Sequence, residues 1–330
     1  MKRAAALLLA TVLGLLLLPV RTPAPLVYVP GEGWTYETPG SAKWQRARAE
    51  DQLKVARDAY DEGRFKLATK AAKRVVSRWP NSDFAPDAQY LVGQSYELRT
   101  RDERAFKEYQ KLVERYPKYD QFDTVLVHQF EIANRFLAGQ KFRLWGLIRL
   151  YRSMEKTAEM YSKIIRNGQY SRIAPQAQLN IGVAREKQKD YYLAVRAYEK
   201  AADLYADNPV MAPEALYRAG MAWYKQAKTS EYDQSAAGSA IDTFTDFIIL
   251  YPADPRVPEL RDYIASMKEE QARGALRIAR YYDKRHKLDG AKVYYNEVLR
   301  LDSTSEYAET ARQRLAALKA KEAKAGGSNN

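Results

Sequence analysis

The sequence predicts an all-α protein, a solenoid of antiparallel helix pairs. From about residue 42 onward Ala, Lys, Arg, Glu, Leu and Tyr dominate, and apolar residues recur at intervals of three and four, the period of amphipathic helices. A fixed spacing also recurs, in which a small residue is followed by Ala after twelve positions and by a helix-ending Pro after twelve more. Small residues let paired helices approach closely, and Pro cannot continue a helix, so each copy of this spacing indicates one helix hairpin.

The first two copies of the spacing are intact, and the later copies carry insertions or substitutions. The intact copies are Ala56, Ala68 and Pro80, followed by Gly93, Ala105 and Pro117. This spacing resembles the tetratricopeptide repeat. It predicts about six units and a capping helix from residue 306 to about 321, with the units at residues 49–82, 86–119, 126–172, 175–208, 213–254 and 272–305. Most aromatic residues fall at helix-facing intervals, so we expect them in the core rather than in a binding site.

The first 24 residues have the pattern of a secretory signal peptide. Met1-Lys2-Arg3 is basic, residues 4–20 are apolar and rich in Leu, and Thr22-Pro23-Ala24 provides the small residues of a cleavage site. A buried helix and an uncleaved membrane anchor are the alternatives for the apolar run. The pattern therefore predicts an exported protein, which meets little nucleic acid.

The segments that flank the predicted array have a different composition. Residues 25–44 are rich in Pro and Gly, which break both helical and strand periods, so we expect an extended tether there. The repeat array then spans residues 45–323, and the Gly, Ser and Asn of residues 324–330 predict a disordered tail.

The composition excludes several kinds of chemistry. The chain has no cysteine, which excludes disulfides, thiolate metal sites, cysteine nucleophiles and a thioether-linked lipid. It has two histidines, His128 and His286, too few for a multi-histidine metal site. No phosphate-binding loop or nucleophile elbow is present. We therefore predict a protein that is not an enzyme and that has no catalytic residues, no cofactor and no bound metal.

Several segments of the predicted array have features beyond the shared spacing. They are Tyr60 to Phe65 with Ala68, the run Arg78-Trp79-Pro80-Asn81-Ser82, Ala85 to Tyr96, Arg273 to Arg285, Ala291 to Leu299, and the interrupted third unit with its insertion between Ala138 and Ser153. Together they resemble the BamD family of outer-membrane assembly lipoproteins. The resemblance covers about residues 45–318. It implies a periplasmic scaffold of the machine that folds β-barrel proteins into the outer membrane, with the barrel subunit, other assembly factors and substrate strands as partners.

The sequence departs from this family in two respects. Members are usually attached by a lipid on a cysteine just after the signal, and this chain has no cysteine. Its best-known members have five repeats, whereas six are predicted here. Protein contacts, the tether or the uncleaved N-terminal helix would have to hold the protein at the periplasmic face of the outer membrane. A periplasmic scaffold for cell-wall synthesis or division is the alternative function, and a cytoplasmic location would favour an enzyme or a nucleic-acid binder instead.

The first helices of such units line a concave groove, where an extended peptide would bind. The predicted groove residues are Leu53, Arg57, Tyr60, Tyr90, Gln94 and Glu97. A solvated face without a tight partner is the alternative.

Two stretches carry basic residues without any acid. Residues 64–78 contain six, on what should be the outer helix of the first unit, and such a run is usually a solvated face. Residues 135–152 contain five more, interleaved with apolar residues, which predicts a basic, aromatic-rich helical insertion. We expect this insertion to contact a partner or an anionic membrane surface, with packing onto the neighbouring unit as the alternative. Its candidate residues are Lys141, Phe142, Arg143, Trp145, Arg149, Tyr151 and Arg152.

Overall fold

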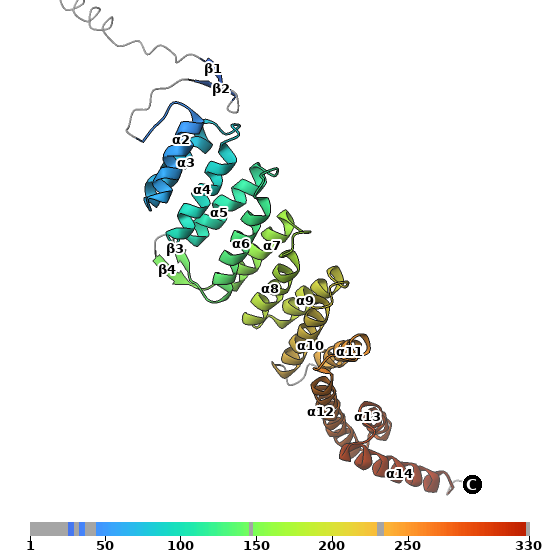
Figure 1. The fold of residues 1–330 in the computed structure, drawn as a ribbon. Helices are drawn as coiled ribbons and strands as arrows, with labels where there is room; N and C mark the ends of the chain where they lie inside the picture. Colours follow the sequence, from blue (N-terminus) through green and yellow to red (C-terminus); the bar gives the residue numbers. More distant parts are fainter. Residues whose placement is uncertain (1–25, 30–32, 37–43, 145–147, 230–233, 328–330) are drawn as a thin grey trace, which may run out of the picture. The chain divides into compact units, whose positions relative to one another are not determined.

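Antiparallel helix pairs make up most of the chain (Figure 1). The structure, a computed structural model, describes residues 26–29, 33–36, 44–144, 148–229 and 234–327. Within them the six pairs are α2 (Ala49–Asp61) with α3 (Phe65–Arg78), α4 (Ala85–Leu98) with α5 (Asp102–Arg115), α6 (Phe122–Leu137) with α7 (Met154–Asn167), α8 (Ala174–Lys187) with α9 (Tyr191–Leu204), α10 (Met211–Thr229) with α11 (Gln234–Leu250), and α12 (Val257–Lys284) with α13 (Leu288–Leu301). The single helix α14 (Glu306–Gly327) follows the last pair.

These pairs confirm the predicted fold class, an all-α array of tetratricopeptide-type hairpins with a capping helix. The sixth pair begins earlier than predicted, because Pro258 lies in the first turn of α12, where its missing N–H is tolerated. The capping helix is also longer than predicted, because α14 continues through the Ala- and Lys-rich segment to Gly327. The predicted disordered tail is therefore wrong for residues 324–327, while residues 328–330 lie outside the described residues.

The chain divides into two compact units, residues 1–132 and residues 133–330. In the first unit the small residues of the repeated spacing lie at helix contacts. Ala56, Ala68 and Ala72 are fully buried where α2 and α3 pack. At the next pair, a Cβ atom on Gly93 would lie 2.3 Å from the ring of Tyr109, so only glycine allows α4 and α5 this approach.

The second unit repeats this close approach. A Cβ atom on Gly182 would lie 2.3 Å from the ring of Tyr198, and one on Gly220 would lie 2.4 Å from the ring of Phe244. Apolar clusters join α8 to α10, α10 to α12, and α12 to α14, so that each helix pair shares its core with the next. Tyr198 and Phe244 are fully buried core residues, as predicted for aromatics at helix-facing positions, whereas Tyr192 of α9 is 55% exposed.

A hydrogen-bonded carboxylate accompanies the small residue in three of the pairs. The Tyr109 hydroxyl donates to Glu97 at 2.9 Å, the Tyr198 hydroxyl donates to Glu186 at 2.8 Å, and the Tyr295 hydroxyl donates to Asp283 at 3.0 Å. Each acid lies four residues after its small residue, and a basic side chain from the following helix pair or from α14 contacts it; these side chains are those of His128, Lys225 and Arg314. The carboxylate therefore ties each pair to the next helix.

Two short β-hairpins depart from the predicted organisation. Strands β1 (Leu26–Val29) and β2 (Gly33–Tyr36) pair in antiparallel fashion within the predicted tether, and the rings of Tyr28 and Trp34 meet edge-to-face at 5.5 Å. Strands β3 (Phe142–Leu144) and β4 (Ile148–Tyr151) pair within the insertion that was predicted to be helical. Each strand contains at least one aromatic residue, and β1, β2 and β4 also contain β-branched residues, which favour an extended chain. The helical prediction for this insertion is therefore wrong.

None of the helices in the described part of the chain is long and apolar enough to cross a membrane. The predicted signal peptide of residues 1–24 lies outside the described residues.

Candidate partner-binding surfaces

The predicted groove residues lie on α2 and α4, but they do not share one open surface. Leu53 is 2% exposed and belongs to the core, so its predicted exposure to a ligand is wrong. It follows Ala49 by four residues and precedes Ala56 by three, and this spacing places all three on the buried face of α2. Arg57 is exposed, and Tyr60 and Gln94 are partly buried.

The exposed edge of this face is held by a chain of polar contacts. The Arg57 guanidinium lies 2.5 Å from one carboxylate oxygen of Asp87, and the Tyr119 hydroxyl donates to the other at 3.1 Å. Burial and the neighbouring Asp87 charge raise the pKa of Tyr119, which keeps its hydroxyl protonated as a donor. The Arg57 side chain remains 55% exposed, so its guanidinium has room for a second acceptor.

Deeper between the helices, Tyr90 and Glu97 enclose the imidazole of His128. The Tyr90 hydroxyl lies 3.1 Å from Nε2 of His128, and Glu97 lies 3.1 Å from Nδ1. The ring of Tyr109 stacks on this imidazole at 5.3 Å. Burial raises the pKa of Tyr90, so its phenol also stays neutral. Tyr90 and Glu97 thus hold helices α4 and α6 together, and this contact fixes the position of the groove.

Among the described residues, Glu97, His128 and Glu131 form a group that could hold a metal ion, because their ligand atoms lie within 4.8 Å of one another. One imidazole and two carboxylates would suit a borderline divalent cation. However, the carboxylate of Glu97 already accepts a hydrogen bond from Tyr109 and faces His128. The group is therefore satisfied as a structural contact.

The basic run of residues 64–78 forms α3 and the turn before it, and several of its cations are engaged within the protein. Lys70 lies 4.6 Å from the ring of Trp44. Lys73 lies 3.1 Å from Glu108 and also contacts the hydroxyl of Tyr96. These contacts are those of a packed outer helix rather than of an open cationic patch.

The insertion between α6 and α7 is anchored by its first aromatic residue. Phe142 is 3% exposed and stacks on Phe136 of α6 with ring centroids 4.1 Å apart. Arg152 donates to the carbonyl of Gly139 at 2.9 Å, which closes the base of the hairpin. Lys156 covers the rings of Phe142 and Tyr151. For Phe142, packing onto the neighbouring helix is thus the observed arrangement.

The remaining candidate residues of the insertion are placed unequally. Lys141 is exposed and Arg143 is partly buried, while Arg149 pairs with Arg143 across the hairpin. Trp145 lies outside the described residues.

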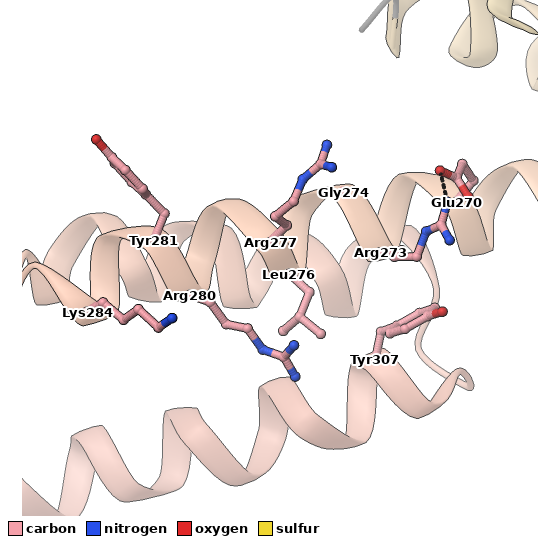
Figure 2. A pocket seen from close by; sticks show the side chains of 9 residues that line it. All are labelled: Glu270, Arg273, Gly274, Leu276, Arg277, Arg280, Tyr281, Lys284 and Tyr307. Atoms are coloured by element: carbon pink, nitrogen blue, oxygen red, sulfur yellow. Dashed lines mark hydrogen bonds and ion pairs between the residues drawn. The ribbon is translucent and has the colours of Figure 1, made fainter. Parts of the chain in front are cut away.

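A further surface, a groove between α12 and α14, was not among the sequence predictions (Figure 2). It has a volume of about 650 Å³ and is lined by three arginines and a lysine of α12. The sequence carries a signal for it, because these cations recur at steps of four, three and four along one helix: Arg273, Arg277, Arg280 and Lys284. Asp283 interrupts this basic run, so the run is not one of the two acid-free stretches of the sequence.

Comparison with known families matches two models to the chain. A model described as "Outer membrane lipoprotein", the YfiO family, matches residues 151–326, which is more than half of the chain. A tetratricopeptide-repeat model matches residues 87–119, which include most of α4 and all of α5. No curated protein sequence matches the chain.

Solved structures with a similar fold are distant in sequence. The C-terminal part of a repeat-containing protein from Cytophaga hutchinsonii is 18% identical, with a TM-score of 0.35 over 80% of this chain and 87% of that chain. PilF from Pseudomonas aeruginosa is 15% identical, with a TM-score of 0.29 over 80% of this chain and 97% of that chain. A tetratricopeptide-repeat protein from Parabacteroides merdae is 12% identical, with a TM-score of 0.32 over 81% of this chain and 97% of that chain.

Proposed function

Because the chain belongs to the YfiO (BamD) family of outer membrane lipoproteins, we propose that it is a non-enzymatic subunit of the machinery that folds β-barrel proteins into the outer membrane. The observation that carries this proposal is the family match over residues 151–326, which covers helices α7 to α13 and most of α14. A tetratricopeptide-repeat array is a scaffold for protein–protein interaction, since stacked helix pairs present long surfaces to other chains.

In this proposal the protein is exported and acts in the periplasm. It contacts the barrel subunit and other assembly factors through the exposed edge of α2 and α4 and through the β3–β4 hairpin. Arg57, Tyr60 and Gln94 are the groove residues that remain accessible for such contact, and Lys141 and Arg152 are exposed on the insertion. Cations beside aromatic rings suit an acidic or extended protein segment.

Attachment to the membrane must differ from that of lipid-anchored members of the family. No residue of the sequence is a cysteine, so no residue can carry a thioether-linked lipid. We propose that contacts with membrane-embedded partners hold the protein at the periplasmic face of the outer membrane.

Site-specific crosslinking in cells tests this function. A photoreactive phenylalanine analogue is placed at Gln94 and, in a second variant, at Lys141, with Lys107 on the outer face of α5 as the control position. A large outer-membrane barrel protein should crosslink to the first two positions and not to the control. Recovery of cell-wall synthases or division proteins instead would favour the alternative scaffold role and contradict the proposal.

A further inference from the structure

The groove between α12 and α14 has an apolar floor and charged rims. Leu276 forms its floor and is 3% exposed, and Tyr307 of α14 forms part of the opposite wall. Figure 2 shows Arg280 and Leu276 reaching from α12 toward α14, while Arg277 and Tyr281 project from the outer rim. The groove lies wholly within the second compact unit.

The positive charge of this groove is not neutralised from within the protein. Residues 273–287 contain six arginines and lysines but a single acid, Asp283. That acid is already engaged, since Arg314 lies 2.9 Å from it and the Tyr295 hydroxyl donates to it. Arg273 pairs with Glu270 at one end of the groove.

Three cations are left without an acidic partner. No acid in the described part of the chain lies within ion-pair distance of Arg277, Arg280 or Lys284. All three are exposed, and steps of three and four residues place their Cα atoms along one side of α12, from which Arg280 reaches toward α14 and Arg277 projects away from it (Figure 2). Together they form a cationic stripe beside an apolar floor.

The spacing of this stripe fits an extended chain. Lys284 follows Arg277 by seven positions, which corresponds to about 10 Å along the helix axis. Alternate side chains of an extended strand on one side repeat about every 6.6 Å, so two or three acidic side chains at alternate positions lie within reach of the three long cationic side chains. The residues between them would point to the opposite side, toward either Leu276 or solvent.

We propose that this groove binds an extended, acidic segment of a partner protein, with aspartate or glutamate at alternate positions and an apolar side chain on the Leu276 floor. The proposal rests on the scaffold function proposed above, and it assigns to that function a partner chemistry and a site. A flat anionic membrane fits less well, because the buried Leu276 floor lies between α12 and α14, where a single extended segment can reach it. Glu270, which also lines the groove, is paired with Arg273 and leaves the three other cations available.

Fluorescence anisotropy with a defined probe tests the proposal on the purified full chain. The probe is a fluorescein-labelled nonapeptide with aspartate at alternate positions and a central phenylalanine, and its control peptide has asparagine in place of aspartate. The test variant combines Arg277→Gln, Arg280→Gln and Lys284→Gln. The matched variant combines Lys54→Gln, Lys66→Gln and Lys107→Gln, three exposed lysines of the first compact unit, so that both variants lose the same charge.

The aspartate probe should bind the unaltered chain, and it should bind the test variant about tenfold more weakly, because three charged contacts of modest strength are lost. The matched variant should keep its affinity, and the asparagine peptide should bind weakly to all three. Equal affinity of the test variant and the unaltered chain for the probe would overturn the proposal. So would binding to phosphatidylglycerol vesicles that depends on the three cations while the probe does not bind.

Crosslinking at Gln94 separates this proposal from the broader function. If the unaltered chain crosslinks to a barrel protein but does not bind the probe, the groove proposal fails and the scaffold function stands. If the probe binds through the cationic stripe but no barrel protein is recovered, the groove is an acidic-segment site and the proposed function fails.

Discussion

The ring of Tyr198 lies so close to Gly182 that no side chain fits between them. A Cβ atom at residue 182 would approach the ring to 2.3 Å, and the ring cannot withdraw because it is fully buried and its hydroxyl is held by Glu186. We predict that Gly182→Ala destabilises the protein by about 1–3 kcal/mol, since overpacking forces helices α8 and α9 apart. Denaturant unfolding measures this change.

Gly238 provides the matched control for this substitution. It also lies in a helix, α11, but nothing stands within 4 Å of the position that a Cβ atom would occupy. Gly238→Ala should be neutral or should stabilise by up to about 1 kcal/mol, because alanine favours helix more than glycine does. A loss of stability equal to that of Gly182→Ala would show that the close approach to Tyr198 is not the cause.

Glu108 is a buried acid whose stabilising contacts depend on its charge. Burial by itself raises its pKa, but the hydrogen bond from Gln89 and the charges of Lys73 and Lys111 outweigh burial and leave the pKa below the ordinary value of 4.5. An acid with a lowered pKa stabilises the folded state fully above its unfolded pKa, and this stability is lost as the pH falls through its folded pKa.

We therefore predict that Glu108→Gln lowers stability by about 1 kcal/mol at neutral pH and by less as the pH falls below 4.5. Thermal unfolding of both proteins over this range measures the difference. The two curves should converge at low pH, and a constant separation would contradict a role for the Glu108 charge.

At the scale of elements, helix pairs were predictable because each carries a repeated small residue and a helix-ending Pro. The expected starts of the first five units lie within a few residues of the observed helix starts. The β3–β4 hairpin was not predictable in the same way. Its strands are three and four residues long, too short for an alternating pattern to be distinguished from a helical one in a chain dominated by helices.

The candidate site was less predictable than the fold, for a reason that individual residues make clear. The groove residues of α2 were predicted by counting from its small residue, Ala56. This count places both Arg57 and Leu53 on the surface, but only Arg57 is exposed and Leu53 is buried. It also could not show that Tyr90 and Glu97 meet His128, which lies on the next helix pair. Contacts between neighbouring helix pairs depend on how the pairs pack together, and the residue spacing within one pair does not specify this packing.

The β3–β4 hairpin depends on the stacking of Phe142 on Phe136, and this yields a prediction. Phe142→Ala should make local opening of the hairpin easier by about 3 kcal/mol, because a buried ring is lost. Amide hydrogen exchange of β3 and β4 should then become about a hundredfold faster, while exchange in α8 and α9 stays unchanged. Lys141→Ala, at an exposed neighbour, is the control and should leave exchange as it was.

At the scale of the whole molecule, the hydrogen bond from a tyrosine hydroxyl to a carboxylate recurs along the array. The tyrosine and the acid occur in the same helix pairs. In the pair α10–α11, Phe244 stands at the tyrosine position, and Tyr224 stands at the position of the acid. In an array of this kind each helix pair is stabilised mainly by its neighbours. The carboxylate contacts therefore contribute to cooperativity along the chain as well as to the stability of one pair.

Attachment to the membrane provides the last prediction. A chain without cysteine cannot carry the thioether-linked lipid, and no helix of the described residues can span a bilayer. If protein contacts hold the protein at the membrane, alkaline carbonate should release it from isolated outer membranes, because high pH disrupts charged contacts but leaves acyl anchors inserted. A lipoprotein with an acylated cysteine, followed in the same membranes, should stay in the pellet. Retention of this protein in the pellet as well would show instead that the apolar segment of residues 4–20 remains as an anchor.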